Sequence, residues 1–232
     1  MKDSHMNTIG EKYILVGMNK NAHIINRSNG ELHRELDLKN REMSTSLVFG
    51  KQLYIGTYVD TLFIFSSRDF SFIQLVRTHE SLLSMCIISK LDSVIAIGEA
   101  GGFVDIIRPV TGEEVDRELD RIIKREREKR EAKEFNEWFE RYQNQLVGEN
   151  KPTTKYIVQS YIRIKEAGYI NKVIVTKSKK EIVIASEKGI FICKINNNSL
   201  EPPIKERYLQ GQLVSQIYEF NPHQLIAAQF HS

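Results

Sequence analysis

The chain has 232 residues and 41% hydrophobic residues, so it is long enough to bury a core and too apolar to be intrinsically disordered. Its formal net charge of +3 gives no reason to expect binding to nucleic acid or to a membrane surface by bulk electrostatics. The two cysteines, Cys86 and Cys193, lie in apolar runs, which indicates buried free thiols rather than a disulfide or metal framework.

The N-terminal residues, MKDSHMNTIGEKY, lack the apolar core of a signal peptide, and no apolar run reaches the ~20 residues of a membrane span. We therefore expect a cytoplasmic protein, with the nucleus as the alternative compartment. Ser4-His5-Met6 is the kind of remnant that cloning leaves, so we give residues 1–6 no structural weight.

A short apolar strand that ends in a small residue recurs along the chain. Its copies are ILVG at 14–17, LYIG at 53–56, IAIG at 95–98, IVIA at 182–185 and LIAA at 225–228. The final small residues are 39, 42, 87 and 43 positions apart, and 87 corresponds to two periods or to one period plus an insertion. A unit of about 40 residues cannot bury both faces of its own sheet, so neighbouring units must stack.

Turn residues divide each period into short strands, as at Arg27–Gly30, where an Asn-Gly pair predicts a hairpin. In chain order we expect strands at 12–17, 22–26 and 31–38; at 46–49, 52–56, 61–65 and 70–77; at 82–88, 94–98, 103–107 and 113–119; at 155–165, 171–176, 181–185 and 190–195; and at 214–220 and 225–230.

The third unit resembles a repeat of the WD40 β-propeller family. Thr78-His79 stands where that family often has Gly-His, Asp92 lies in the following turn, Gly98 closes a strand and Gly112 turns into the outer strand. The Trp-Asp dipeptide of the family is absent, with Ile107-Arg108 in its place. The resemblance implies an all-β, WD40-like β-propeller of about five four-stranded repeats, fewer than the family's usual seven. It also implies structural roles for His79, Asp92, Gly98 and Gly112, with His79 anchoring a blade through hydrogen bonds.

A charged segment interrupts the repeats between the third and fourth units. Residues 120–147 include 15 charged residues and no glycine or proline, which predicts one long α-helix of the type found in coiled coils. Gly148 and Pro152 then supply the stop. We therefore divide the chain into propeller repeats at 7–119, a helical insertion at 120–150 and further repeats at 151–232.

The predicted helix has an aromatic face near its end, formed by Phe135, Trp138, Phe139 and Tyr142. These side chains either dock the helix on the chain's own repeats or bind a partner protein, since aromatic anchors dominate helix-in-groove interfaces. The preceding run Lys124–Arg130 has the basic residues of a nuclear localisation or nucleic-acid signal, but its interleaved glutamates favour a solvated helix face.

No catalytic, cofactor or metal motif is recognisable. None of the six histidines lies at a metal-ligand spacing from Cys, His or Glu. The glycine-rich stretch Glu99–Gly102 lies between two strands, which predicts a hairpin turn, whereas a phosphate cradle needs the N–H groups of a helix start.

The expected function is therefore a non-enzymatic protein–protein interaction scaffold of the WD40-like type, which binds other proteins within a multi-subunit complex and uses its projecting helix as an extra docking element. Two alternatives stay open: an accessory or regulatory propeller domain of a larger enzyme, and a reader of peptides or small molecules. A fold of this kind hosts many functions and does not select among them.

Overall fold

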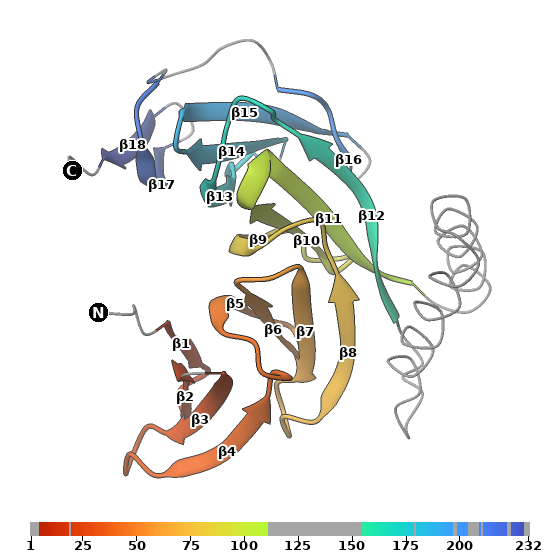
Figure 1. The fold of residues 1–232 in the computed structure, drawn as a ribbon, viewed down its shortest axis with the longest axis vertical. Helices are drawn as coiled ribbons and strands as arrows, with labels where there is room; N and C mark the ends of the chain where they lie inside the picture. Colours follow the sequence, from red (N-terminus) through yellow and green to blue (C-terminus); the bar gives the residue numbers. More distant parts are fainter. Residues whose placement is uncertain are drawn as a thin grey trace. The chain divides into compact units, whose positions relative to one another are not determined.

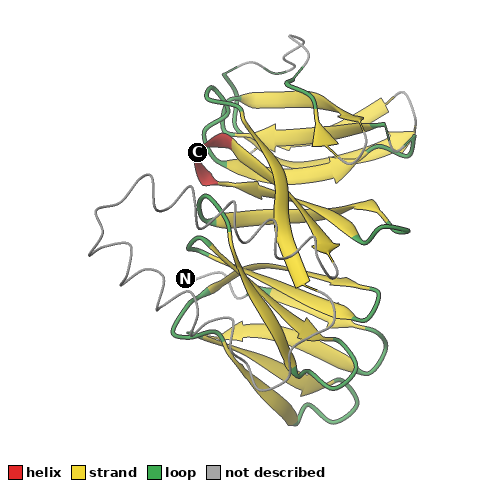
Figure 2. Ribbon diagram, turned by 90° about the vertical axis from the view of Figure 1, so that its right-hand side faces the viewer, coloured by secondary structure: helices red, strands yellow, loops and turns green. Residues whose placement is uncertain are grey.

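The computed structural model of the chain describes residues 5–18, 20–110, 155–178, 180–196, 199–203, 209, 211–221 and 224–229. The described residues are all-β: they form the strands β1 to β18 and one 3-10 turn, η1 (Ala100–Gly102) (Figure 2). The chain divides into two compact units, one made of Met1–Arg108 with Val158–Ser232 and the other of Pro109–Ile157. Nearly all of the described residues belong to the first unit.

The strands form five separate antiparallel sheets, four with four strands and one with two (Figure 1). The first sheet contains β1 (Met6–Ile9), β2 (Tyr13–Met18), β3 (Asn21–Asn26) and β4 (Leu32–Asp37). The second contains β5 (Met43–Phe49), β6 (Gln52–Thr57), β7 (Thr61–Ser66) and β8 (Phe72–Arg77). The third contains β9 (Leu82–Ser89), β10 (Val94–Glu99), β11 (Phe103–Val110) and β12 (Lys155–Arg163). The fourth contains β13 (Ile170–Val175), β14 (Glu181–Ser186), β15 (Gly189–Asn196) and β16 (Ser199–Leu200), and the fifth contains β17 (Val214–Asn221) and β18 (Gln224–Gln229).

This architecture corrects the fold class predicted from the sequence. The described residues form separate sheets that do not close into a propeller, and they contain no α-helix and no coiled coil. The prediction of a WD40-like propeller with WD repeats and a coiled coil was therefore wrong for this part of the chain. The physical reason is that a period of about 40 residues predicts sheets that stack on their neighbours, and it does not determine whether the stack closes. The predicted helix at 120–150 lies outside the described residues.

The third sheet differs from the prediction in its outer strand. The place beside β11 was expected to belong to residues 113–119, whereas β12 occupies it. The outer strand of this sheet therefore comes from the segment that follows the charged run, and the interruption falls inside the third unit rather than after it. Outer strands of either origin are polar on one side, so composition did not distinguish them.

The first sheet also contains a strand that was not predicted. β1 begins at Met6 and pairs with β2 along its whole length, from Met6 opposite Val16 to Ile9 opposite Tyr13. The first sheet thus has the same four-stranded, antiparallel order as the second sheet.

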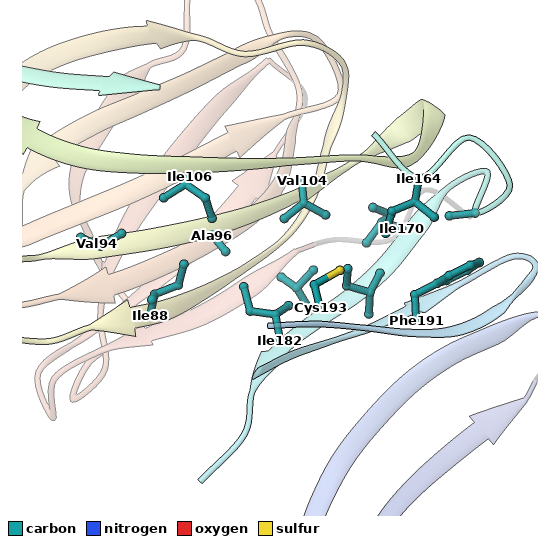
Figure 3. Close-up of a cluster of buried hydrophobic side chains, with 13 residues drawn as sticks. Ile88, Val94, Ala96, Val104, Ile106, Ile164, Ile170, Ile182, Phe191 and Cys193 are labelled. Atoms are coloured by element: carbon teal, nitrogen blue, oxygen red, sulfur yellow. The ribbon is translucent and has the colours of Figure 1, made fainter. Parts of the chain in front are cut away.

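Neighbouring sheets pack face to face and share apolar cores. Between the third and fourth sheets, side chains from β10 and β11 face those from β13, β14 and β15, as Figure 3 shows for Ala96, Val104 and Ile106 opposite Ile170, Ile182 and Cys193. A second core joins the first two sheets, and a third joins the fourth sheet to β17 and β18. Each sheet buries one face on its neighbour, which is the stacking that the sequence period requires.

The recurring small residue of the sequence has a physical reason in this packing. It is the last residue but one of the second strand of a sheet, where the first strand of the next sheet comes close. A Cβ atom added to Gly17 would lie 3.0 Å from Met43 Cε, and one added to Gly56 would lie 2.9 Å from Leu82 Cβ. One added to Gly98 would lie 2.5 Å from Ile170 Cγ2. Only a residue with a very small side chain permits the sheets to come this close.

Hydrogen bonds also join the first strands of successive sheets. The Asn7 side chain of β1 donates to the Ser46 carbonyl of β5 at 3.2 Å, and the Ser44 hydroxyl of β5 donates to the Leu82 carbonyl of β9. The Ser84 hydroxyl of β9 accepts from the Val173 N–H of β13 at 3.2 Å. The Asn171 side chain of β13 donates to the Val214 carbonyl of β17 at 3.0 Å. Every sheet boundary thus carries one side-chain-to-backbone hydrogen bond between first strands.

Candidate functional site

Three titratable side chains of the third sheet converge at one end of that sheet. His79 lies in the segment that precedes β9, Glu99 ends β10 and Asp105 lies within β11. In the antiparallel register Asp105 is opposite Ile97, so Glu99, two residues after Ile97, shares its face and lies diagonal to it. We call these three residues the His79 cluster.

His79 is held by both polar and aromatic contacts. Its Nδ1 lies 2.7 Å and 3.0 Å from the two carboxylate oxygens of Asp105. Its ring stacks on the Phe103 ring, with centroids 4.8 Å apart and an angle of 5° between the planes. The centroid of the Tyr161 ring lies 4.1 Å from that of His79. The His79 side chain is 32% exposed, whereas that of Asp105 is completely buried. The imidazole is therefore fixed in one orientation at the edge of a buried carboxylate.

Glu99 is fully buried, and its two oxygens have different surroundings. Oε2 accepts hydrogen bonds from the backbone N–H groups of His79, at 3.1 Å, and of Glu80, at 2.6 Å. Oε1 is buried and has no hydrogen-bond partner. Burial, together with the charge of the nearby Asp105 carboxylate, raises the pKa of Glu99 far above the usual value for a glutamic acid.

The His79 cluster therefore places two buried carboxyl groups beside one another. Within the described part of the chain, no lysine or arginine forms an ion pair with either of them. One candidate ligand atom from each of His79, Glu99 and Asp105 lies within 4.8 Å of the others. Two carboxylates in such a position require a positive charge between them, which either a shared proton or a bound cation supplies.

The other residues singled out in the sequence lie elsewhere. Asp92 is in the turn after β9, where its carboxylate accepts a hydrogen bond from the Ser89 hydroxyl at 2.9 Å. Gly98 is at the close approach of the third and fourth sheets described above. Gly112 and the aromatic candidates Phe135, Trp138, Phe139 and Tyr142 lie outside the described residues.

Neither cysteine has the character of a reactive thiol. Both are free, with Cys193 buried and Cys86 half-buried. Burial raises the pKa of each thiol to about 12, so the nucleophilic thiolate form is scarce near neutral pH.

Sequence reasoning singled out His79 and missed its two acidic neighbours. Glu99 is 20 and Asp105 is 26 residues away, so no local spacing connects them. A usable signal was present, because Asp105 interrupts the apolar run Phe-Val-Asp-Ile-Ile and Glu99 ends the run Val-Ile-Ala-Ile-Gly-Glu. A charged residue inside a strand that is otherwise apolar marks a buried polar contact.

Comparison of the sequence with protein-family models and with curated proteins gives no match. Among the described residues, no helix has the length and apolar composition needed to cross a bilayer.

Proposed function

We propose that this protein is a non-enzymatic protein–protein interaction scaffold, which binds a partner protein on the outer face and free edge of its fifth sheet. The carrying observation is that this two-stranded sheet has one face packed on the fourth sheet and an exposed apolar pair, Tyr218 and Ile226, on its opposite face. A cytoplasmic location and membership of a multi-subunit complex are parts of the same proposal.

The two faces of the fifth sheet differ sharply in exposure. On the inner face, Ile217 is fully buried against a core that includes Val183 and Ala185 of the fourth sheet. On the outer face, Tyr218 is 59% exposed and Ile226 is 53% exposed. These two residues are opposite each other in the register of β17 and β18, so they form one apolar pair. An exposed cross-strand pair of this size is the type of anchor that protein interfaces bury.

The edge of the fifth sheet offers a second means of binding. β18 pairs with β17 along one side, and no other strand of the described residues pairs with its second side. An edge strand presents N–H and C=O groups in a row that another chain can extend. A partner that adds a strand beside β18 would therefore also place one of its own side chains next to Ile226 on the outer face.

A reader of small molecules receives less support. A shallow depression of about 210 Å³ lies between the β1–β2 and β3–β4 turns and is lined by Glu11, Lys12, Asn26, Arg27 and Ser28. Ligand pockets are usually about 300–1,000 Å³ and mostly apolar, whereas these lining side chains are polar or charged.

Site-specific photo-crosslinking tests the proposal. A photoreactive phenylalanine analogue is introduced at Tyr218 or at Ile226 in cells that express the chain, and crosslinked adducts are identified by mass spectrometry. Tyr169, which is 52% exposed and lies in the turn between β12 and β13, is the matched control position. We expect one partner protein, or a second copy of this chain, in adducts from positions 218 and 226 but not from 169.

A variant provides the second arm of the experiment. With the photoreactive group at position 226, the substitution Tyr218→Lys is expected to abolish the adduct, because it places a charge at the centre of the apolar pair. Adducts that form equally at all three positions, or that survive Tyr218→Lys, would contradict the proposal. Absence of any adduct at positions 218 and 226 would contradict it as well.

A further inference from the structure

The two buried carboxyl groups of the His79 cluster have a single basic neighbour among the described residues, His79. Glu99 and Asp105 are both fully buried, and within the described residues His79 is the only basic side chain that contacts either of them. Its Nδ1 lies against Asp105, whereas Oε2 of Glu99 accepts hydrogen bonds from two backbone N–H groups. A neutral peptide N–H does not balance a buried carboxylate charge, so either a proton or a bound cation must neutralise Glu99.

The unpartnered oxygen of Glu99 indicates where that charge belongs. Oε1 is buried and accepts no hydrogen bond, although Oε2 of the same carboxyl group accepts two. Buried polar atoms almost always have a partner, and an exception in a cluster of metal-ligating groups points to an ion. The candidate ligand atoms of His79, Glu99 and Asp105 converge within 4.8 Å of one another.

The type of donor selects the class of cation. One imidazole nitrogen and two carboxylate oxygens are a ligand set for Zn²⁺ and related first-row divalent ions, whereas Mg²⁺ and Ca²⁺ prefer oxygen ligands alone. Zinc–ligand bonds are about 2.0–2.2 Å long, so the three ligand atoms, which lie within 4.8 Å of one another, must move closer together to share one ion. The partial exposure of His79 leaves a path from solvent to a fourth coordination position.

The surroundings already orient the ligands. The His79 ring lies against Phe103 and Tyr161, and two backbone N–H groups hold Oε2 of Glu99 while leaving Oε1 available. Contacts of this kind fix ligand orientation before the metal binds. We propose that His79, Glu99 and Asp105 form a binding site for one divalent transition-metal cation of the Zn²⁺ class.

Isothermal titration calorimetry of the full chain with Zn²⁺, after removal of bound metal by a chelator, tests the assignment. We expect one high-affinity Zn²⁺ per chain, an increase in Tm on binding, and the visible absorption of a low-symmetry Co²⁺ complex when Co²⁺ replaces Zn²⁺. Mg²⁺ is expected to give no comparable binding. The substitution Glu99→Gln preserves size and should weaken Zn²⁺ binding at least about 10-fold, because it removes an anionic ligand.

Matched controls separate this site from adventitious binding by other histidines. His23 and Glu35 are opposite each other on β3 and β4, so they form a cross-strand His–Glu pair outside the cluster. His23→Gln and Glu35→Gln are expected to leave Zn²⁺ affinity unchanged. If Glu99→Gln fails to fold by circular dichroism, the partly exposed His79→Gln takes its place, with the same expected loss.

Three results would overturn the assignment. The first is the absence of Zn²⁺ binding by the wild-type chain, which would leave a shared proton as the positive charge of the cluster. The second is Zn²⁺ affinity that persists in Glu99→Gln and His79→Gln but falls in His23→Gln. The third is tight binding of Mg²⁺ in place of Zn²⁺.

Discussion

At the scale of single residues, the turn between β7 and β8 shows how local hydrogen bonds change the acidity of an exposed side chain. Hydrogen bonds from the Ser66 and Ser71 side chains and from the Ser71 backbone lower the pKa of Asp69 from 3.8 to about 2. Ser71 donates its hydroxyl to Asp69 Oδ1 at 2.8 Å. The ionised carboxylate therefore supports this turn at any pH above its unfolded-state pKa, and the support is lost as the pH falls toward 2.

We predict that Ser66→Ala raises the pKa of Asp69 toward 3.8, because it removes the largest cause of the shift. The measurement is an NMR titration of the Asp69 carboxyl carbon. Ser67→Ala is the control, since the Ser67 hydroxyl donates to the Gly50 carbonyl and not to Asp69. An unchanged Asp69 pKa in Ser66→Ala, or an equal rise in Ser67→Ala, would show that the hydrogen bond from Ser66 is not what lowers the pKa of Asp69.

Gly98 gives a second prediction at the residue scale. In Gly98→Ala the new Cβ would lie 2.5 Å from Ile170 Cγ2 and 2.9 Å from Val173 Cγ1, both on stiff, β-branched side chains. We expect a loss of about 1–3 kcal/mol in the free energy of unfolding, measured by chemical denaturation. Gly17→Ala should cost less, because its Cβ would meet the flexible Met43 side chain. Equal losses in the two variants would contradict this explanation.

The sequence revealed Gly98 but not the polar cluster one residue later, and the two outcomes have different causes. Gly98 recurs at a fixed period, so its packing role leaves a pattern that can be read along the chain. Glu99 and Asp105 come together only when β10 and β11 pair in register, and the segment before β9 then brings His79 into contact with Asp105. Such a meeting depends on tertiary structure, which local spacing does not encode.

At the scale of elements, turn residues predicted strands well where turns are short. The hairpin at Arg27–Gly30 joins β3 to β4 as expected, with Gly30 at a φ of +73°. The strand at 155–165 was predicted, but prediction failed to place it beside β11, because it comes from far along the chain. Prediction also failed for β1, whose sequence Met-Asn-Thr-Ile is too short to show a clear alternation.

Hydrogen bonds between first strands allow a prediction about single sheets. Asn171→Ala removes the hydrogen bond to the Val214 carbonyl and should cost about 0.5–1.5 kcal/mol. Because this hydrogen bond holds β17 against β13, we expect its loss to speed hydrogen exchange in β17 and β18, measured by mass spectrometry. Asn7→Ala removes the equivalent bond to Ser46 and should accelerate exchange in β1 and β2 instead. Uniform acceleration in either variant would argue against independent sheet boundaries.

At the scale of the whole molecule, the sequence predicted that sheets stack but not that the described sheets stay open. Stacking follows from the apolar strand that recurs in each unit of the sequence. Closure depends on the total number of sheets and on what covers the first and last of them. The apolar pair Tyr218 and Ile226 shows that the outer face of the fifth sheet is not covered by any other described sheet.

The difference between the two faces of the fifth sheet is measurable as stability. Ile217→Ala should lower the free energy of unfolding by about 2–5 kcal/mol, because it opens a cavity in a core. Ile226→Ala should change it by less than about 0.5 kcal/mol, because its side chain is 53% exposed. Chemical denaturation of both variants tests this contrast. A large loss in Ile226→Ala would mean that its face is already covered within the isolated chain.

The origin of β12 has a consequence for how the protein reaches its native state. The end of β11 at Val110 and the start of β12 at Lys155 are separated by 44 residues, whereas β9, β10 and β11 follow one another through short turns. Joining such distant segments costs little at equilibrium, at ~0.6 kcal/mol for each doubling of loop length, but it slows the search for the correct pairing. We expect the third sheet to acquire its outer strand late in folding. Since that strand brings the Tyr161 ring onto His79, the polar cluster would take its final form only after the sheets around it exist.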